Sequence, residues 1–269
     1  MVAFGSAVVA KRGLPPALII GGVIASGTVA SAGALALNSY LEMDVDARMR
    51  RTRDRPLPSR RIVPPSHALV LGLGLLVAGV AIALTTLNLI ASFFVALGAF
   101  IYVPVYTLWL KPRTSWNIVL GGFAGSCAAL AGWYAVTGVG FYLVAWILAA
   151  LVFVWTPSHF WSLAVITEQD YTAAGIPMLP SLIGSAAASK YIVANTLLLI
   201  PVSLTFSIYL NGLGLFVYLV IALIFDALVL WTNLKLLQSP TKDNAWLAFK
   251  FSSPYLAMIF LVAIVAAVL

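Results

Sequence analysis

The feature that most limits the fold of this chain is its series of long apolar runs. These runs repeatedly exceed the roughly 20 residues that a helix needs to cross a bilayer, and only 9% of the 269 residues are charged. Because the bilayer core offers no water to the backbone, each spanning segment must satisfy its own hydrogen bonds, as a helix does. The chain is therefore expected to be all-α, a polytopic bundle of transmembrane helices.

Eight complete spans are expected, after a shorter apolar run at Met1–Ala10. Little of the chain remains for a soluble part, so residues 1–269 are expected to form a single transmembrane domain. The one cysteine, Cys127, offers neither a disulfide partner nor a CxxC metal motif. The expected spans are approximately Pro15–Leu41, His67–Thr86, Leu89–Leu110, Trp116–Thr137, Phe141–Ile166, Lys190–Leu210, Leu213–Leu237 and Ala245–Leu269.

The connections between these spans alternate between uncharged and charged. "TTLN", "TGVG" and "NGLG" carry no charge, whereas the Arg-rich stretch, "LKPRTS", "TEQDYTAAGIPMLPS" and "QSPTKDN" do; Lys11 and Arg12 break the alternation. The positive-inside rule places the charged connections in the cytoplasm. A prokaryotic plasma membrane is expected, because no organellar transit segment is evident. The net charge of +7 needs no nucleic acid to explain it, although the arginines could bind anionic lipid.

The most charged connection, "NSYLEMDVDARMRRTRDRP", holds four acids and five arginines in the nineteen residues 38–56. Asn38, Glu42 and Asp46 follow one another at intervals of four residues, which places them along one stripe of a helix. Mg²⁺ suits such a stripe, since it takes one or two carboxylates, waters and substrate phosphate oxygens. Arginine forks complement phosphate. A metal-bound diphosphate is one interpretation, and an ordinary charged helix end is the other.

A second acidic connection follows the fifth span and contains Glu168 and Asp170. The number of spans between the two acidic stretches puts both at the same face of the membrane. Carboxylates from two separate connections would then meet at one end of the bundle, and this strengthens the interpretation as a metal site.

Three stretches of the chain resemble the UbiA superfamily of intramembrane prenyltransferases, in the version found in its protoheme IX farnesyltransferase (haem O synthase) family. They are the acidic stripe with "MRRTRDRPLP", "LKPRTSWNIVLGG" at 110–122, and "WTPSHFWSLAVITEQDYTAAGIPMLP" at 155–180. The resemblance implies a UbiA-type bundle of nine spans, of which Met1–Ala10 would be the remnant of the first. The chain departs from the family at Glu42, which replaces the commoner Asp, and in having Asp170 where many members have two aspartates.

The resemblance implies that the chain transfers the farnesyl group of farnesyl diphosphate to a vinyl group of haem b, with addition of water, to give haem O. It implies Mg²⁺ held by the catalytic residues Glu42, Asp46 and Asp170. It also suggests haem A synthase or a terminal oxidase assembly as downstream partners in the bilayer. The residues that it implies for substrate binding are Asn38, Arg51, Arg55, Lys111, Arg113, Asn117, His159 and Tyr171.

Several of these residues have simpler explanations. His159 could bond to a neighbouring helix instead of haem, and Asn117 could cap a helix. His67 is better explained as a helix start, and Asp226, an acid within an apolar span, could serve either a function or a partner helix. Two other functions stay open: a UbiA-type prenyltransferase acting on a quinone precursor or a lipid, and a membrane transporter.

Overall fold

The computed structural model describes all residues 1–269, which form helices and no strand. The long helices match the expected spans, with ends that agree within three residues except at the start of the sixth. That span begins at Ser185, because Gly184 precedes it at φ 79° and the small residues "SAAAS" are helical. The elements are α1 Val2–Lys11, α2 Ala17–Leu41, α3 Met43–Asp46, α4 Ser66–Thr86, α5 Leu89–Phe100, η1 Ile101–Leu110, α6 Asn117–Gly121, α7 Phe123–Thr137, α8 Leu143–Ile166, α9 Glu168–Ala174, α10 Leu179–Ile183, α11 Ser185–Thr205, η2 Phe206–Tyr209, α12 Gly212–Gln238 and α13 Lys242–Val268.

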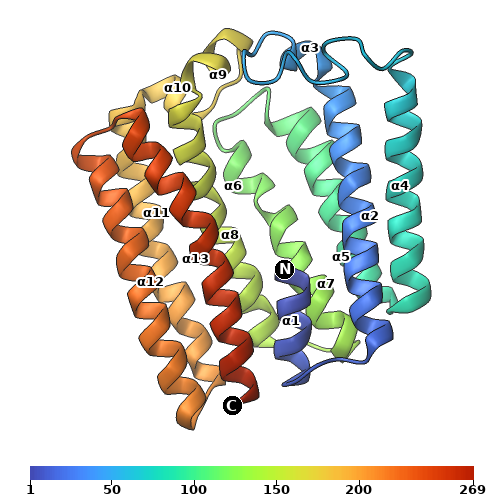
Figure 1. Ribbon diagram of the computed structural model, residues 1–269, viewed down its shortest axis with the longest axis vertical. Helices are drawn as coiled ribbons and strands as arrows, with labels where there is room; N and C mark the ends of the chain where they lie inside the picture. Colours follow the sequence, from blue (N-terminus) through green and yellow to red (C-terminus); the bar gives the residue numbers. More distant parts are fainter.

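The long helices run side by side along the longest axis of the molecule (Figure 1). Neighbours in the chain pack against each other, from α2 with α4 and α5 with α7 to α12 with α13, while short α1 lies against α7 and α13. The connections 42–65, 111–116 and 167–184 gather at one end with α3, α9 and α10 (Figure 1). We call this end the mouth face.

Small residues let α2 and α4 approach closely. A Cβ atom on Gly79 would lie 2.5 Å from the Ala30 backbone nitrogen, and one on Gly33 would lie 2.5 Å from that of Leu76. Since lipid provides no hydrophobic drive for helix association, contacts of this kind hold membrane helices together by close packing. The α2–α4 pair therefore depends on residues without side chains at these points.

Polar contacts join the C-terminal helices. Both carboxylate oxygens of Asp226 in α12 accept hydroxyl hydrogen bonds, from Ser203 of α11 at 2.7 Å and from Tyr255 of α13 at 2.8 Å. Asp226 is 2% exposed, so it meets the need of a buried acid for partners. It therefore fits the interpretation as a helix partner.

The third span changes its helical type halfway. Residues Ile101–Leu110 form a π-helix, η1, in place of the α-helix that α5 begins. Pro104 lies inside it and has no N–H to donate, and the Lys111 N–H bonds to the Tyr106 carbonyl five residues back at 2.8 Å. The change of register alters which side chains of this span face the mouth.

Candidate active site

The first acidic motif lies where α2 gives way to α3. Glu42 interrupts regular helical geometry, with φ −101° and ψ 7°. The helical hydrogen bonds nevertheless continue across it: the Glu42 N–H donates to the Asn38 carbonyl at 2.9 Å, and the Asp46 N–H donates to the Glu42 carbonyl at 2.7 Å. The predicted four-residue spacing is thus preserved, and both carboxylate residues are buried, at 6% and 4% exposure.

Glu42 is held by two side chains. The Lys111 ammonium lies 2.5 Å from Oε1 and 2.7 Å from Oε2, and the Asn38 Nδ2 group donates to Oε2 at 3.1 Å. Both side chains of the ion pair are largely shielded from solvent, at 13% and 8% exposure. The structure therefore brings three of the predicted residues together, from α2 and from the end of η1.

Asp46 forms an ion pair with Arg55. The Arg55 guanidinium donates to Oδ2 at 3.0 Å, and the arginine itself is 44% exposed. The connection is folded back over the acid, because the Thr52 hydroxyl donates to the Asp46 carbonyl at 2.9 Å. Each buried carboxylate of the first motif thus has a basic partner: Lys111, after η1, for Glu42, and Arg55, in the connection 42–65, for Asp46.

The second acidic motif reaches the first through the backbone. The Arg50 N–H donates to Asp170 Oδ1 at 3.2 Å, so α9 touches the Arg-rich connection. Glu168 instead accepts a hydrogen bond from the Ser185 hydroxyl at 2.6 Å. Burial raises the pKa of the Tyr171 phenol, and the positive charge of Arg51 opposes that rise. Tyr171 thus stays protonated at neutral pH and can donate a hydrogen bond.

The acids do not converge on one point: no three of the His, Cys, Asp and Glu side chains form a group able to hold a metal ion by themselves. Glu42 and Asp46 share the mouth with Lys111 and Arg55, while Asp170 lies against Arg50. The donor set suits a cation that completes its coordination with water and substrate oxygens, as Mg²⁺ does.

Three further predicted residues have their closest partners outside this cluster, although Asn117 Nδ2 also lies 3.5 Å from the Lys111 carbonyl. The Arg113 guanidinium donates to the carbonyls of Leu108 and Trp109 at 2.9 and 3.0 Å. Asn117 Nδ2 donates to the Thr114 carbonyl at 2.7 Å, and its buried Oδ1 has no partner. His159 Nδ1 lies 2.5 Å from the Ser252 hydroxyl, with the ring stacked between Trp155 and Phe249. Their roles in substrate binding stay predictions.

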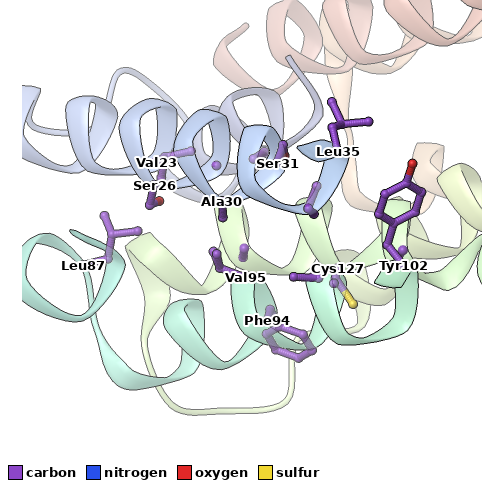
Figure 2. A pocket seen from close by; sticks show the side chains of 18 residues that line it. Val23, Ser26, Ala30, Ser31, Leu35, Leu87, Phe94, Val95, Tyr102 and Cys127 are labelled. Carbon is purple, nitrogen blue, oxygen red and sulfur yellow. The ribbon is translucent and has the colours of Figure 1, made fainter. Parts of the chain in front are cut away.

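An apolar pocket of about 300 Å³ lies between α2, α5 and α7, lined by 18 residues of which 14 are hydrophobic. Tyr102 lies at one end and Leu87 at the other, with Cys127 and Val95 between them (Figure 2). The Tyr102 end is the one near the acids, because Thr107 contacts the Tyr102 carbonyl and Asn38. A polar mouth thus leads into an apolar interior.

Sequence reasoning did not select three residues near this junction. The Thr107 hydroxyl lies 2.8 Å from Asn38 Oδ1. Tyr102 and Tyr106 stack with ring centroids 6.0 Å apart, and the Lys111 ammonium lies 5.9 Å from the Tyr106 centroid. Polar and aromatic residues directly before the basic loop are the signal that could have drawn attention to them.

Comparison with known proteins identifies relatives of this chain. The family model described as the UbiA prenyltransferase family matches residues 1–265. "Protoheme IX farnesyltransferase 1" from Cenarchaeum symbiosum (strain A) is 51% identical over 238 residues, which cover 88% of this chain and 79% of that protein. "Protoheme IX farnesyltransferase" from Sulfurisphaera tokodaii is 44% identical over 260 residues, 94% of this chain and 84% of that protein.

Solved structures share the fold at low sequence identity. A structure of digeranylgeranylglyceryl phosphate synthase has a TM-score of 0.79 at 19% identity and covers 99% of this chain and 92% of that one. A UbiA homolog from Archaeoglobus fulgidus bound to DMAPP and Mg²⁺ has a TM-score of 0.69 at 15% identity, covering 97% and 94%. With eight apolar helices of spanning length and a family match over almost its whole length, the chain is a multi-pass membrane protein that belongs to the UbiA prenyltransferase family.

Proposed function

We propose that this prenyltransferase moves the farnesyl group of farnesyl diphosphate to a vinyl group of protoheme IX, with addition of water, to give haem O. The choice of acceptor rests on relatives named protoheme IX farnesyltransferase at 40–51% identity over most of the chain. The observation in this structure that carries the chemistry is the buried pair of carboxylates, each with a basic partner, at the entrance to an apolar pocket.

Mg²⁺ is the metal that we propose for this mouth. Glu42 and Asp46 would be its protein ligands, with Asp170 facing it from the second motif. The carboxylates do not form a complete set of ligands, and Mg²⁺ usually completes its coordination with waters and the phosphates of a substrate. A UbiA homolog of the same fold was solved with DMAPP and Mg²⁺. When bound, Mg²⁺ supplies positive charge to the leaving diphosphate.

The basic residues of the mouth would act on the diphosphate directly. Lys111 and Arg55 pair with the two carboxylates, and they would supply neutralising charge to a diphosphate bound at the mouth. Negative charge grows on the diphosphate as its bond to the farnesyl carbon breaks, and cations already in place stabilise that change most. Arg51 and Arg113, on the same face, would extend the positive field around the leaving group.

The apolar pocket would hold the farnesyl chain. Fourteen of its 18 lining residues are hydrophobic, and its nucleophilic groups are the hydroxyls of Ser26, Ser31 and Tyr102 and the thiol of Cys127. Breaking the carbon–oxygen bond leaves an allylic cation, and a dry wall protects it from water until the haem vinyl group attacks the farnesyl carbon. Water then adds to the resulting cation and releases a proton, which leaves a hydroxyethylfarnesyl side chain. His159, Asn117 and Tyr171 would contact the two substrates.

The reaction would take place at the cytoplasmic side of a plasma membrane. Of the fifteen Lys and Arg residues, nine lie in the connections 42–65 and 111–116 of the mouth face, whereas Lys11 and Arg12 lie at the opposite end. This bias sets orientation through the positive-inside rule. Haem A synthase or a terminal oxidase assembly would take up the product.

The test is conversion of haem b by membranes that contain the expressed chain. Membranes are incubated with haem b, farnesyl diphosphate and Mg²⁺, with and without a chelator, and haem O is sought by mass spectrometry. We expect chelator-sensitive haem O, with activity restored by added Mg²⁺. A chain that leaves haem b unchanged and prenylates a quinone precursor or a lipid would overturn the choice of acceptor, and chelator-resistant turnover would overturn the metal.

A further inference from the structure

The π-helix η1 places three side chains on a stripe that an α-helix would scatter. Tyr102 lines the pocket, Thr107 contacts Asn38, and Lys111 follows directly after the helix to pair with Glu42. In an α-helix, residues five and nine positions after Tyr102 would be turned from it by roughly 140° and 180°. With hydrogen bonds from i to i+5, the turn is wider, at roughly 80° per residue, and both come within roughly 50° of Tyr102.

Of these three side chains, Thr107 is the one that contacts Asn38, which in turn contacts the Glu42 carboxylate; Thr107 itself contacts no carboxylate. It is 6% exposed, and its hydroxyl lies 2.8 Å from both Asn38 Oδ1 and the Tyr102 carbonyl. Both neighbours are acceptors, so the single hydroxyl proton is shared between them. The Tyr102 carbonyl lies five residues back, so the π-helical backbone itself fixes the direction in which the hydroxyl points.

The Asn38 amide lies between the Thr107 hydroxyl and the Glu42 carboxylate. With Oδ1 toward Thr107, the Nδ2 group faces Glu42 and donates to Oε2 at 3.1 Å. Reversal of the amide would place its oxygen against a carboxylate oxygen and leave the Glu42 side chain without this donor. The Thr107 hydroxyl therefore acts on Glu42 through one intermediate residue.

We propose that Thr107 is a positioning residue for Glu42, which it holds in place for the metal through Asn38. The inference rests on the proposed function only in taking Glu42 as a metal ligand. Residues that orient a ligand without touching the metal change metal affinity about 10- to 100-fold when they are lost. The π-helical register of η1 thus has a role, because it brings the threonine to the amide.

The test compares Thr107→Val, which keeps shape and loses the hydroxyl, with Thr107→Ser, which keeps the hydroxyl. Thr156→Val is the matched control: Thr156 is 7% exposed, and its hydroxyl bonds only to the Val152 carbonyl of its own helix. The full chain is purified in detergent, and Mn²⁺ affinity is measured by electron paramagnetic resonance with inorganic diphosphate present. Mn²⁺ accepts the same carboxylate and phosphate oxygens as Mg²⁺.

We expect Thr107→Val to weaken Mn²⁺ binding about 10-fold, Thr107→Ser to bind like the original chain, and Thr156→Val to show no change. In an Asn38→Ala background, Thr107→Val should cause no further loss, because residues that act through a shared partner are not additive. An equal loss with and without Asn38 would overturn the proposal, as would unchanged affinity in Thr107→Val or failure of Thr107→Ser to restore it.

The same preparation separates this inference from the proposed function. Conversion of haem b is assayed beside Mn²⁺ binding. If the original chain binds Mn²⁺ and makes no haem O, the acceptor is wrong, and the Mn²⁺ comparison still decides the role of Thr107. If the original chain binds no Mn²⁺ in the presence of diphosphate, Glu42 is no metal ligand and the positioning role is overturned.

Discussion

At the scale of single residues, the mouth is organised by pairing each buried acid with a cation. Two carboxylates four residues apart on a helix repel each other, and a buried charge without a partner costs several kcal/mol. Lys111 and Arg55 offset part of that cost for Glu42 and Asp46. A diphosphate that draws these cations toward itself frees carboxylate oxygens for a metal, so metal and diphosphate are expected to favour each other's binding.

Asp46 offers the sharpest test of the acids themselves. Asp46→Asn keeps the size of the side chain and removes its charge, so Arg55 loses its ion pair and the metal loses a ligand. We expect haem O formation to fall by about 100-fold or more, measured as initial rate against Mg²⁺ concentration at equal membrane content of protein.

The matched control for this change is Asp44→Asn. Asp44 lies in the same short helix and is exposed, so its loss should leave turnover and metal dependence as they were. Equal turnover in the Asp46→Asn and original proteins would remove Asp46 from the metal site. Equal loss in both variants would point to the charge of the whole segment instead.

At the scale of elements, α2, whose end carries the start of the acidic motif, packs closely against α4. We predict that Gly79→Ala destabilises the protein by about 1–3 kcal/mol, because the added methyl group meets the Ala30 backbone, which cannot move aside as a side chain can. The measurement is the midpoint of thermal unfolding in detergent, followed by near-ultraviolet circular dichroism.

Gly74→Ala is the control in the same helix. A Cβ atom at Gly74 meets nothing within 4 Å, and alanine favours a helix over glycine by up to about 1 kcal/mol. This variant should be as stable as the original chain or slightly more so. If the two variants unfold at the same temperature, close packing at Gly79 does not hold the pair together.

The elements also show how far sequence reasoning reaches. The hydrophobic runs identify eight spans, because the cost of polar groups in lipid leaves a strong compositional signal. Spacing places Asn38, Glu42 and Asp46 together, since hydrogen bonds within a few residues fix that geometry. The polar and aromatic residues of Ile101–Leu110 mark this segment, but they do not show that its register is π-helical, so the meeting of Thr107 with Asn38 could not be predicted. The partners of Arg113 and His159 likewise depend on tertiary packing.

At the scale of the whole molecule, charge is distributed unevenly between its two ends. The mouth face carries the Arg-rich connection, while the opposite end has Arg12, whose guanidinium donates to the Tyr209 hydroxyl at 3.0 Å and lies over its ring. Lys11 and Arg12 are two basic residues at this end, against nine in the connections 42–65 and 111–116 of the mouth face. The orientation is therefore set by the mouth face, which we expect in the cytoplasm.

Cysteine labelling tests this orientation, because the single native cysteine, Cys127, is buried and should not react. Asp54→Cys places a thiol on the mouth face, where the native side chain is 82% exposed, and Val139→Cys places one at the opposite end, where the native residue is 84% exposed. A membrane-impermeant maleimide added to spheroplasts should label Val139→Cys alone, and both variants should react after the membrane is disrupted. The reverse pattern would put the acids, and hence the entry of farnesyl diphosphate, outside the cytoplasm. Labelling of both variants in intact spheroplasts would show a mixed orientation and would contradict the single orientation expected from the charge distribution.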